Sequence, residues 1–343
     1  MGVRRANIVV LCACLFVSVA LPAQKNTQTG LEDYTRKLRL APGLVINVLI
    51  YGGHRISGEL IGDYEDTISI TDVSPTGLGF NWSMTYPANA SGHRAVPGQE
   101  MKQSHKASLY YGSDGVPSGY TDWIRLSDSV YTELKAGKKT SLDFDGNENP
   151  ASIQKIAEED LVALVNERKV KLHTLKAKGE NGWYLWVLDN PDFPIIMKGD
   201  SSWHWIVPSF NYAEASGKNL VTQLQQKGEA TTHAIFFAFN SAELKNESKP
   251  ILNTVAQYLK INPAIKIEVQ GHTDNVGGAE FNLKLSQNRA ESVKSYLVKE
   301  AGISAGRLTT KGLGLTLPVS DNSTPQGRAL NRRVVFREVR PAK

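Results

Sequence analysis

One stretch of the chain, from Ile265 to Glu300, constrains the fold more than any other part of the sequence. Apolar and polar residues alternate at its start, which predicts a half-buried strand. The glycine-rich loop GHTDNVGG follows directly, at residues 271–278. Apolar side chains then recur every three or four residues, which predicts a long amphipathic helix from about Ala279 to Glu300. A strand, a tight loop and a long helix in succession indicate an α+β fold around this loop.

Further elements are predicted on both sides of this unit. Residues 233–244 (HAIFFAFNSAEL) are typical of a strand and a turn, and a helix capped by Ser248 follows, with an apolar stripe of Ile251, Leu252, Val255 and Leu259. The segments RLTTKGLG and NRRVVFREV predict two more strands. The predicted order is β-α-β-α-β-β, with the helices on one face of a mixed sheet. In the long helix we expect a buried stripe of Leu283, Ala290, Val293 and Leu297, beside a second stripe of Asn282, Ser286 and Arg289.

The middle of the chain, residues 36–212, differs in composition from the last third. All six tryptophans lie there and none in the last 110 residues or so, which indicates differently built domains. Residues 44–70 predict a β-meander that resembles the small Sm-like and SH3-like folds. Apolar residues at helical spacing predict a helix over residues 152–170. We therefore expect one or more β-rich domains of no recognised family, with a split near residue 150 left open, and a linker over 213–230.

The N-terminus has the layout of a secretory signal peptide over residues 1–23. Arg4 and Arg5 precede an apolar run that ends at small residues, and its length falls short of the ~20 residues that span a bilayer. We expect an exported chain without a transmembrane segment, whose residues 24–35 are loose. Both cysteines, Cys12 and Cys14, lie in the leader, so the mature chain would have no thiol; lipidation at Cys14 is the alternative.

The remaining composition excludes several classes of function. A net charge of +5 is too mild to favour nucleic-acid binding. The sequence contains no Gly-x-Ser-x-Gly elbow, no His-Glu-x-x-His motif and no dinucleotide fingerprint. DFDGNENP has its glycine at the wrong position for a calcium loop. We therefore expect no cofactor, no metal and no enzymatic activity, although an enzyme within residues 31–230 stays an open alternative.

Five segments of the last third together resemble one family. FFAFNSAEL, VQGHTDNVGG, FNLKLSQNRAESVKSYL, KGLGLTLPV and GRALNRRVVF occur in the order and spacing of the OmpA-like family. The resemblance covers residues 231–340, a whole domain, and departs from the family at Asn240, where an aspartate is usual. It implies a domain that binds peptidoglycan non-covalently at the diaminopimelate of the stem peptide. It also implies a periplasmic, cell-wall-bound protein associated with the outer membrane, with other envelope proteins as possible partners or a larger envelope assembly that uses the domain as a foothold.

The resemblance also implies which residues form the site. Asp274 would bind the ammonium of diaminopimelate and Arg289 its carboxylate, through two parallel hydrogen bonds. The remaining site residues that it implies are Gly271, Thr273, Asn275, Asn282, Leu285 and Arg332. The amides of Thr273, Asp274 and Asn275 would add donors, Asn282 would order the loop or the stem peptide, and Leu285 would shape the wall. By spacing alone, Asp274 and Arg289 could equally be an ordinary structural ion pair.

Overall fold

The structure is a computed structural model that describes residues 30–339, apart from 53, 57–58, 62, 85–89, 109–118, 123–124, 145–150, 202–203 and 239. The predicted signal peptide, with Cys12 and Cys14, lies outside the described residues. From Glu32 onward the chain packs as one compact unit. Residues expected to be loose are held at their C-terminal end, because Tyr34 donates its amide to the carbonyl of Lys171 at 2.9 Å and Thr35 is buried.

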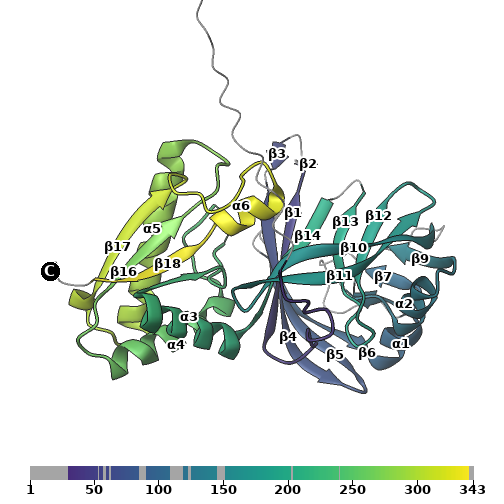
Figure 1. The fold of residues 1–343 in the computed structure, drawn as a ribbon, viewed down its shortest axis with the longest axis horizontal. Helices are drawn as coiled ribbons and strands as arrows, with labels where there is room; N and C mark the ends of the chain where they lie inside the picture. Colours follow the sequence, from purple (N-terminus) through teal and green to yellow (C-terminus); the bar gives the residue numbers. More distant parts are fainter. Residues whose placement is uncertain are drawn as a thin grey trace, which may run out of the picture. The chain divides into compact units, whose positions relative to one another are not determined.

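The region between residues 44 and 212 consists almost entirely of strands (Figure 1). Its main strands are β1 Leu44–Tyr51, β4 Tyr64–Ser74, β5 Gly77–Ser83, β6 Ser91–Pro97, β7 Lys106–Ser108, β8 Thr121–Asp122, β9 Thr140–Phe144, β10 Ala151–Val165, β11 Arg168–Gly179, β12 Tyr184–Leu188, β13 Ile196–Asp200 and β14 His204–Tyr212. They form one sheet in the order β6-β5-β4-β1-β14-β13-β12-β11-β10-β9-β7-β8. An additional pairing of β14 with β10 closes strands β10 to β14 into a ring. We call this part the β-rich region.

Smaller elements complete the β-rich region. Strands β2 His54–Ile56 and β3 Glu59–Ile61 pair only with each other, and the helices are α1 Gly98–Gln103 and α2 Asp128–Lys135. One hydrophobic core contains residues from both sides of position 150, such as Phe80 and Phe210. This core therefore continues across position 150, where the sequence left a domain split open.

The helix predicted over residues 152–170 is wrong, since this stretch forms strand β10. It pairs with β11 in antiparallel register from Ile153 to Val165. The apolar spacing also fits a helix, but Ile156 is 52% exposed, which a core-facing helical stripe would not allow. Long-range pairing with β11 overrides the local pattern, as often happens where strand and helix signals compete.

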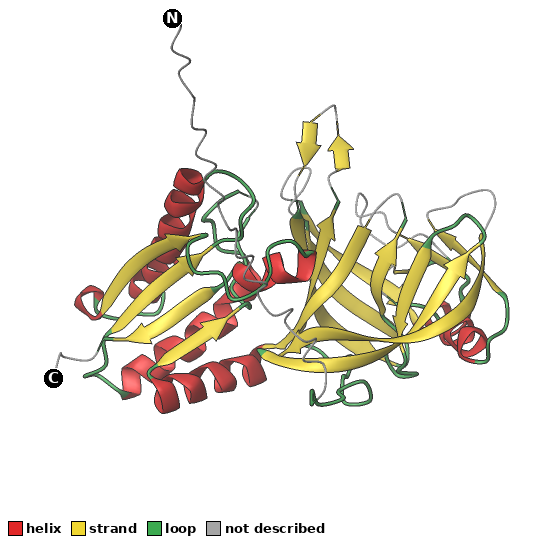
Figure 2. Ribbon diagram, turned by 45° about the horizontal axis from the view of Figure 1, so that its top comes forward, coloured by secondary structure: helices red, strands yellow, loops and turns green. Residues whose placement is uncertain are grey.

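The C-terminal region combines a four-stranded sheet with helices (Figure 2). Its elements are α3 Ala213–Lys227, β15 Glu229–Thr232, a short 3₁₀ turn η1 Asn246–Ser248, α4 Lys249–Ile261, β16 Ile267–His272, α5 Ala279–Lys299, a 3₁₀ turn η2 Ala305–Arg307, β17 Leu308–Gly314, α6 Pro325–Asn331 and β18 Val334–Glu338. The sheet has the order β15-β18-β16-β17, with β16 and β17 parallel and the other neighbours antiparallel. The expected mixed sheet is therefore present.

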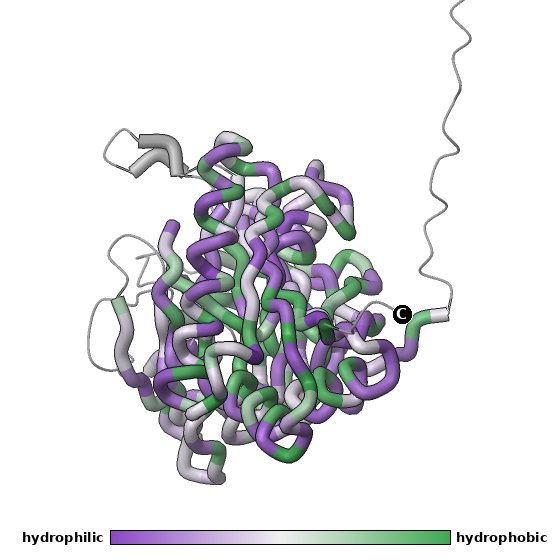
Figure 3. The backbone as a smooth tube through the Cα atoms, turned by 90° about the vertical axis from the view of Figure 1, so that its left-hand side faces the viewer, coloured by the Kyte–Doolittle hydropathy of each residue, from purple (hydrophilic) through white to green (hydrophobic). Residues whose placement is uncertain are grey.

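The order of elements differs from the predicted β-α-β-α-β-β. Helix α6 lies between the last two strands, and the first strand is β15 at 229–232 rather than residues 233–244. The predicted linker over 213–230 forms α3, whose Leu220 and Leu224 belong to the same core as α4 and α5. Alternating positions of the sheet, Ile267 and Val269, belong to this core too, so the three helices pack on the face that these residues present. Figure 3 shows hydrophobic and hydrophilic residues interspersed along this region's backbone.

Helix α4 has the predicted stripe but not the predicted cap. Its four apolar residues are buried. Ser248 is buried as well, and its hydroxyl bonds to the backbone of Phe236, accepting from the amide at 2.8 Å and donating to the carbonyl at 3.0 Å. This serine therefore ties the segment before α4 to the start of the helix.

The buried stripe of α5 differs from the prediction in its first two turns. Leu283 is 50% exposed, whereas Asn282 and Ser286 are buried. The reason is a close approach of α5 to the sheet: a Cβ added to Gly271 on β16 would lie 2.2 Å from the carbonyl oxygen of Ser286. Only small or compact polar side chains fit between elements this close. Ser286 uses its position to accept a hydrogen bond from the amide of Gly314 at 2.8 Å.

Candidate functional site

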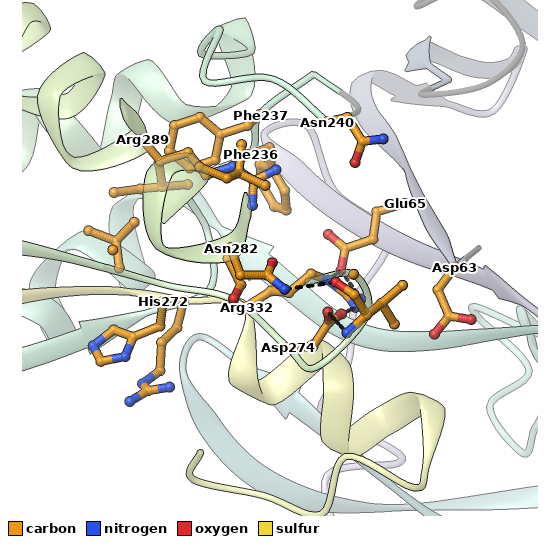
Figure 4. Close-up of a pocket in the computed structure, with 18 of the residues that line it drawn as sticks. Asp63, Glu65, Phe236, Phe237, Asn240, His272, Asp274, Asn282, Arg289 and Arg332 are labelled. Atoms are coloured by element: carbon orange, nitrogen blue, oxygen red, sulfur yellow. Dashed lines mark hydrogen bonds and ion pairs between the residues drawn. The ribbon is translucent and has the colours of Figure 1, made fainter. Parts of the chain in front are cut away.

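A cavity of about 420 Å³ opens beside the loop that follows β16. Seven of the eight predicted site residues line it, namely Gly271, Thr273, Asp274, Asn282, Leu285, Arg289 and Arg332. Asn275 is exposed and does not line it. The fold thus brings together residues from the loop, from helix α5 and from the segment before β18, as Figure 4 shows.

Asp274 lies just past the end of β16, with only 6% of its surface exposed. Its Oδ1 accepts a hydrogen bond from the amide of Val276 at 3.0 Å, and this bond lies within the loop. Its Oδ2 is paired with Nη1 of Arg332. Because an ionised carboxylate has about four acceptor positions, both oxygens can accept further donors. Asp274 is thus a buried anion held in place at the floor of the cavity.

Arg289 comes to the cavity from the middle of α5. Its Nε donates to the carbonyl oxygen of Ser241 at 3.0 Å, and its guanidinium lies over the ring of Phe237, 4.9 Å from the centroid. Within the described residues no carboxylate lies in ion-pair distance of it. Burial lowers the pKa of Arg289 to about 10 and outweighs the nearby charges of Glu65 and Asp274, which raise that pKa. An anion that entered the cavity beside Arg289 would stabilise its charged form further.

The loop itself is ordered by contacts from α5 and β17. Asn282 donates its side-chain amide to the carbonyl of Val276 at 2.9 Å, and Gly277 adopts a φ of 90° that favours glycine. The amide of Thr273 donates to the carbonyl of Gly314 at 3.0 Å, so the expectation that it serves a ligand is wrong. The hydroxyl of Thr273 is buried and has no partner in the described part of the chain. Of the two roles predicted for Asn282, ordering the loop is the one that the contacts support.

Comparison with known proteins gives this region a family. The model of the OmpA family matches residues 236–332. Residues 236–332 form an OmpA-like domain. The chain is 44% identical over 100 residues to outer membrane protein Omp38 of Acinetobacter baumannii, covering 29% of this chain and 28% of that protein. It is 42% identical over 100 residues to the peptidoglycan-binding protein ArfA of Mycobacterium bovis, covering 29% and 30%.

The likeness to these two relatives extends over about 100 residues. The chain spans under a third of the length of these two relatives. Among solved structures, the peptidoglycan-associated lipoprotein of Burkholderia pseudomallei is 33% identical, with 31% of this chain and 88% of that chain covered and a TM-score of 0.29. These matches bear on the OmpA-like domain.

Several residues at the cavity of the OmpA-like domain were not predicted. Asp63 and Glu65, both from the start of the β-rich region, line it together with Phe237 and His272. Glu65 is paired with Arg332, whose Nε donates to Oε1 at 2.8 Å. Nothing in the sequence signals this pairing, because the two residues are 267 positions apart. Phe236 and Phe237 stand out in the sequence as adjacent aromatic residues, but from their segment we predicted only a strand and a turn.

His272 is buried beside the cavity with no partner for either ring nitrogen among the described residues. Burial lowers the pKa of His272 to about 4, and the charges of Arg333 and Arg337 add to the effect. The imidazole is therefore neutral at pH 7. It adds no charge to the site of the OmpA-like domain.

Two further observations concern the described residues only. They contain no group of three or more His, Cys, Asp or Glu side chains arranged to hold a metal ion. No helix among them is long and apolar enough to cross a membrane.

Proposed function

We propose that this chain binds peptidoglycan non-covalently, through the diaminopimelate of the stem peptide, and so attaches an exported protein to the cell wall. The observation that carries the proposal is the charge arrangement in the cavity. A buried carboxylate, Asp274, and the guanidinium of Arg289, which has no carboxylate within ion-pair distance among the described residues, line the same cavity.

The ligand's chemistry matches this pair. The end of a diaminopimelate side chain has an ammonium and a carboxylate on one carbon, so it requires an anion and a cation a few ångströms apart. Asp274 has acceptor positions left for the ammonium. The Nη groups of Arg289 form a planar fork that suits a carboxylate. The unpartnered hydroxyl of Thr273 adds a further hydrogen-bonding group to the cavity.

The relatives support the same reading. ArfA is named a peptidoglycan-binding protein, and Omp38 an outer membrane protein. By likeness we place this chain in the periplasm, bound to the wall and associated with the outer membrane after removal of its leader. We infer a binding role rather than catalysis, since the site consists of charge pairs that hold a zwitterion and the sequence has no catalytic motif.

The test is co-sedimentation of the purified chain, from Gln24 onward, with sacculi. We expect binding to diaminopimelate-type sacculi and much less to lysine-type sacculi, which lack the second carboxylate. Arg289→Ala and Asp274→Asn should each weaken binding by a factor of ~30 or more, since losing one partner of a desolvated charge contact costs ~2–5 kcal/mol.

Arg337→Ala is the matched control for charge, because Arg337 is exposed and pairs with Glu229 at the far end of the sheet. It should bind like the unaltered chain. Undiminished sedimentation of a folded Arg289→Ala protein would refute the proposal.

A further inference from the structure

Asp63, just before strand β4, and Glu65, on that strand, line the cavity of the OmpA-like domain. Asp63 pairs with Arg328 of α6, Oδ2 to Nε at 2.6 Å, and Glu65 pairs with Arg332 just after that helix. Asp63 and Glu65 are two positions apart, so in extended chain their side chains point to the same side. Arg328 and Arg332 are four positions apart, about one helical turn, so they also lie on one side. The two ion pairs form a latch, defined here as Asp63–Arg328 and Glu65–Arg332; Figure 4 labels Asp63, Glu65 and Arg332.

The latch shares a residue with the binding site. Arg332 is held on one side by Asp274 and on the other by Glu65. Burial acts to raise the pKa of Glu65, but the charge and hydrogen bonds of Arg332 outweigh it and hold that pKa below its ordinary value. The Arg289 guanidinium acts on Glu65 in the same direction, so the carboxylate sits in the field of both arginines. Glu65 is thus a carboxylate on a flexible stem, between two cations of the cavity.

We propose that Glu65, which pairs with Arg332 and lines the same cavity as Arg289, competes with the ligand's carboxylate in the unbound protein, so that the β-rich region holds the peptidoglycan site in a self-occupied state. This inference rests on the proposed function, in which Arg289 binds that carboxylate. Glu65 has 26% of its side chain exposed, so its stem can turn away into solvent without a movement of the strand. An incoming zwitterion then binds Arg289 with its carboxylate and Asp274 with its ammonium.

The competing possibility is that Glu65 helps to bind the ammonium as a second anion. The two roles predict opposite changes in ligand affinity when Glu65→Gln removes the charge. In the self-occupied state the apparent affinity is reduced by the fraction of protein whose site is free. A site occupied nine-tenths of the time loses about tenfold in affinity, which removal of the charge would recover.

The experiment measures binding of a soluble, diaminopimelate-containing muropeptide to the purified chain by calorimetry. Glu65→Gln keeps the shape and removes the charge, and we expect it to bind about tenfold more tightly. Asp63→Asn loosens the other half of the latch and should give a smaller increase. Glu180→Gln is the matched control, because Glu180 is exposed and its partner, Lys139, lies in the β-rich region. It should bind like the unaltered chain.

A second measurement does not depend on any variant. Hydrogen exchange of residues 63–66 should accelerate when the muropeptide is added, because the ligand displaces the Glu65 side chain and weakens the latch. Unchanged exchange together with unchanged or weaker binding by Glu65→Gln overturns the inference.

Failure of the proposed function looks different. Binding that Arg289→Ala abolishes but Glu65→Gln leaves unchanged overturns the latch alone. Binding that neither substitution alters, or no binding by any of these proteins, overturns both the proposed function and the inference.

Discussion

The close contact between β16 and α5 leads to a sharp prediction for Gly271→Ala. The added Cβ would lie 2.2 Å from the carbonyl oxygen of Ser286 and 2.9 Å from its carbonyl carbon. Comfortable contacts between such atoms begin at about 3.5 Å, so the two elements must separate by about 1 Å. The obstacle is backbone in the middle of a helix, which cannot rotate away as a side chain could.

We expect the loss in free energy of unfolding to lie at the upper end of the range known for overpacked cores. Inserted methyl groups destabilise well-packed sites by ~1–3 kcal/mol, occasionally more. We expect about 3 kcal/mol for Gly271→Ala, which at ~2–4 °C per kcal/mol lowers the melting midpoint by roughly 6–12 °C. Binding should fall as well, because Asp274 follows only three residues later and moves with the strand.

The assay can separate the two regions. All six tryptophans lie between residues 82 and 205, so their fluorescence reports unfolding of the β-rich region. Circular dichroism at 222 nm follows mainly the helices, and the long ones, α3 to α5, belong to the C-terminal region. The shift should therefore appear in the dichroism melt.

Gly306→Ala serves as the control, because a Cβ there meets no atom within 4 Å and Gly306 has no positive φ. Its stability should change by less than ~0.5 kcal/mol. Equal melting of the two variants would refute the account of why β16 needs a glycine here.

Three further predictions concern single side chains. The pKa of His272 is about 4, below the ordinary 6.5, so the histidine takes up a proton in the unfolded chain first, and the free energy of unfolding should fall by up to ~3 kcal/mol as pH drops from 6.5 to 4. Urea unfolding at several pH values should show this slope, and His272→Gln should flatten it. Phe237→Ala removes the ring under Arg289 and should weaken muropeptide binding by ~0.5–2 kcal/mol in calorimetry, whereas Phe237→Tyr should not. Glu167 accepts the amide of His233 at 2.9 Å and the hydroxyl of Thr232 at 2.6 Å, so Glu167→Ala should cost ~2–4 kcal/mol in thermal melts and Glu167→Gln less; equal losses would contradict this role.

The pattern of apolar residues predicted the secondary structure correctly where a segment packs mainly against its neighbours in sequence. Helix α5 begins at Ala279, as predicted, and the glycine-rich loop lies between it and β16. Helix α4 buries its predicted stripe. In these two segments the helical period of the apolar residues agrees with the face that packs against the core.

The same pattern gave a wrong prediction where a segment distant in the sequence determines the secondary structure or the burial of a side chain. The stretch 152–165 has apolar residues at helical spacing, yet its backbone pairs with β11. In α5, Leu283 was expected inside and is exposed, because β16 comes too near for a leucine. Neither effect is visible from one segment, since each depends on the shape of the element opposite.

The same division holds for the binding site. The sequence by itself determined the loop and the helix that follows it, and the family resemblance pointed to Asp274 and Arg289, which line one cavity in the structure. Only the tertiary structure shows that Arg332 forms ion pairs with both Asp274 and Glu65. It also shows that a carboxylate of the β-rich region lines this cavity. Charges interact over a few ångströms of space regardless of the 267 positions of chain between them, so this part of the site exists only once the whole unit has folded.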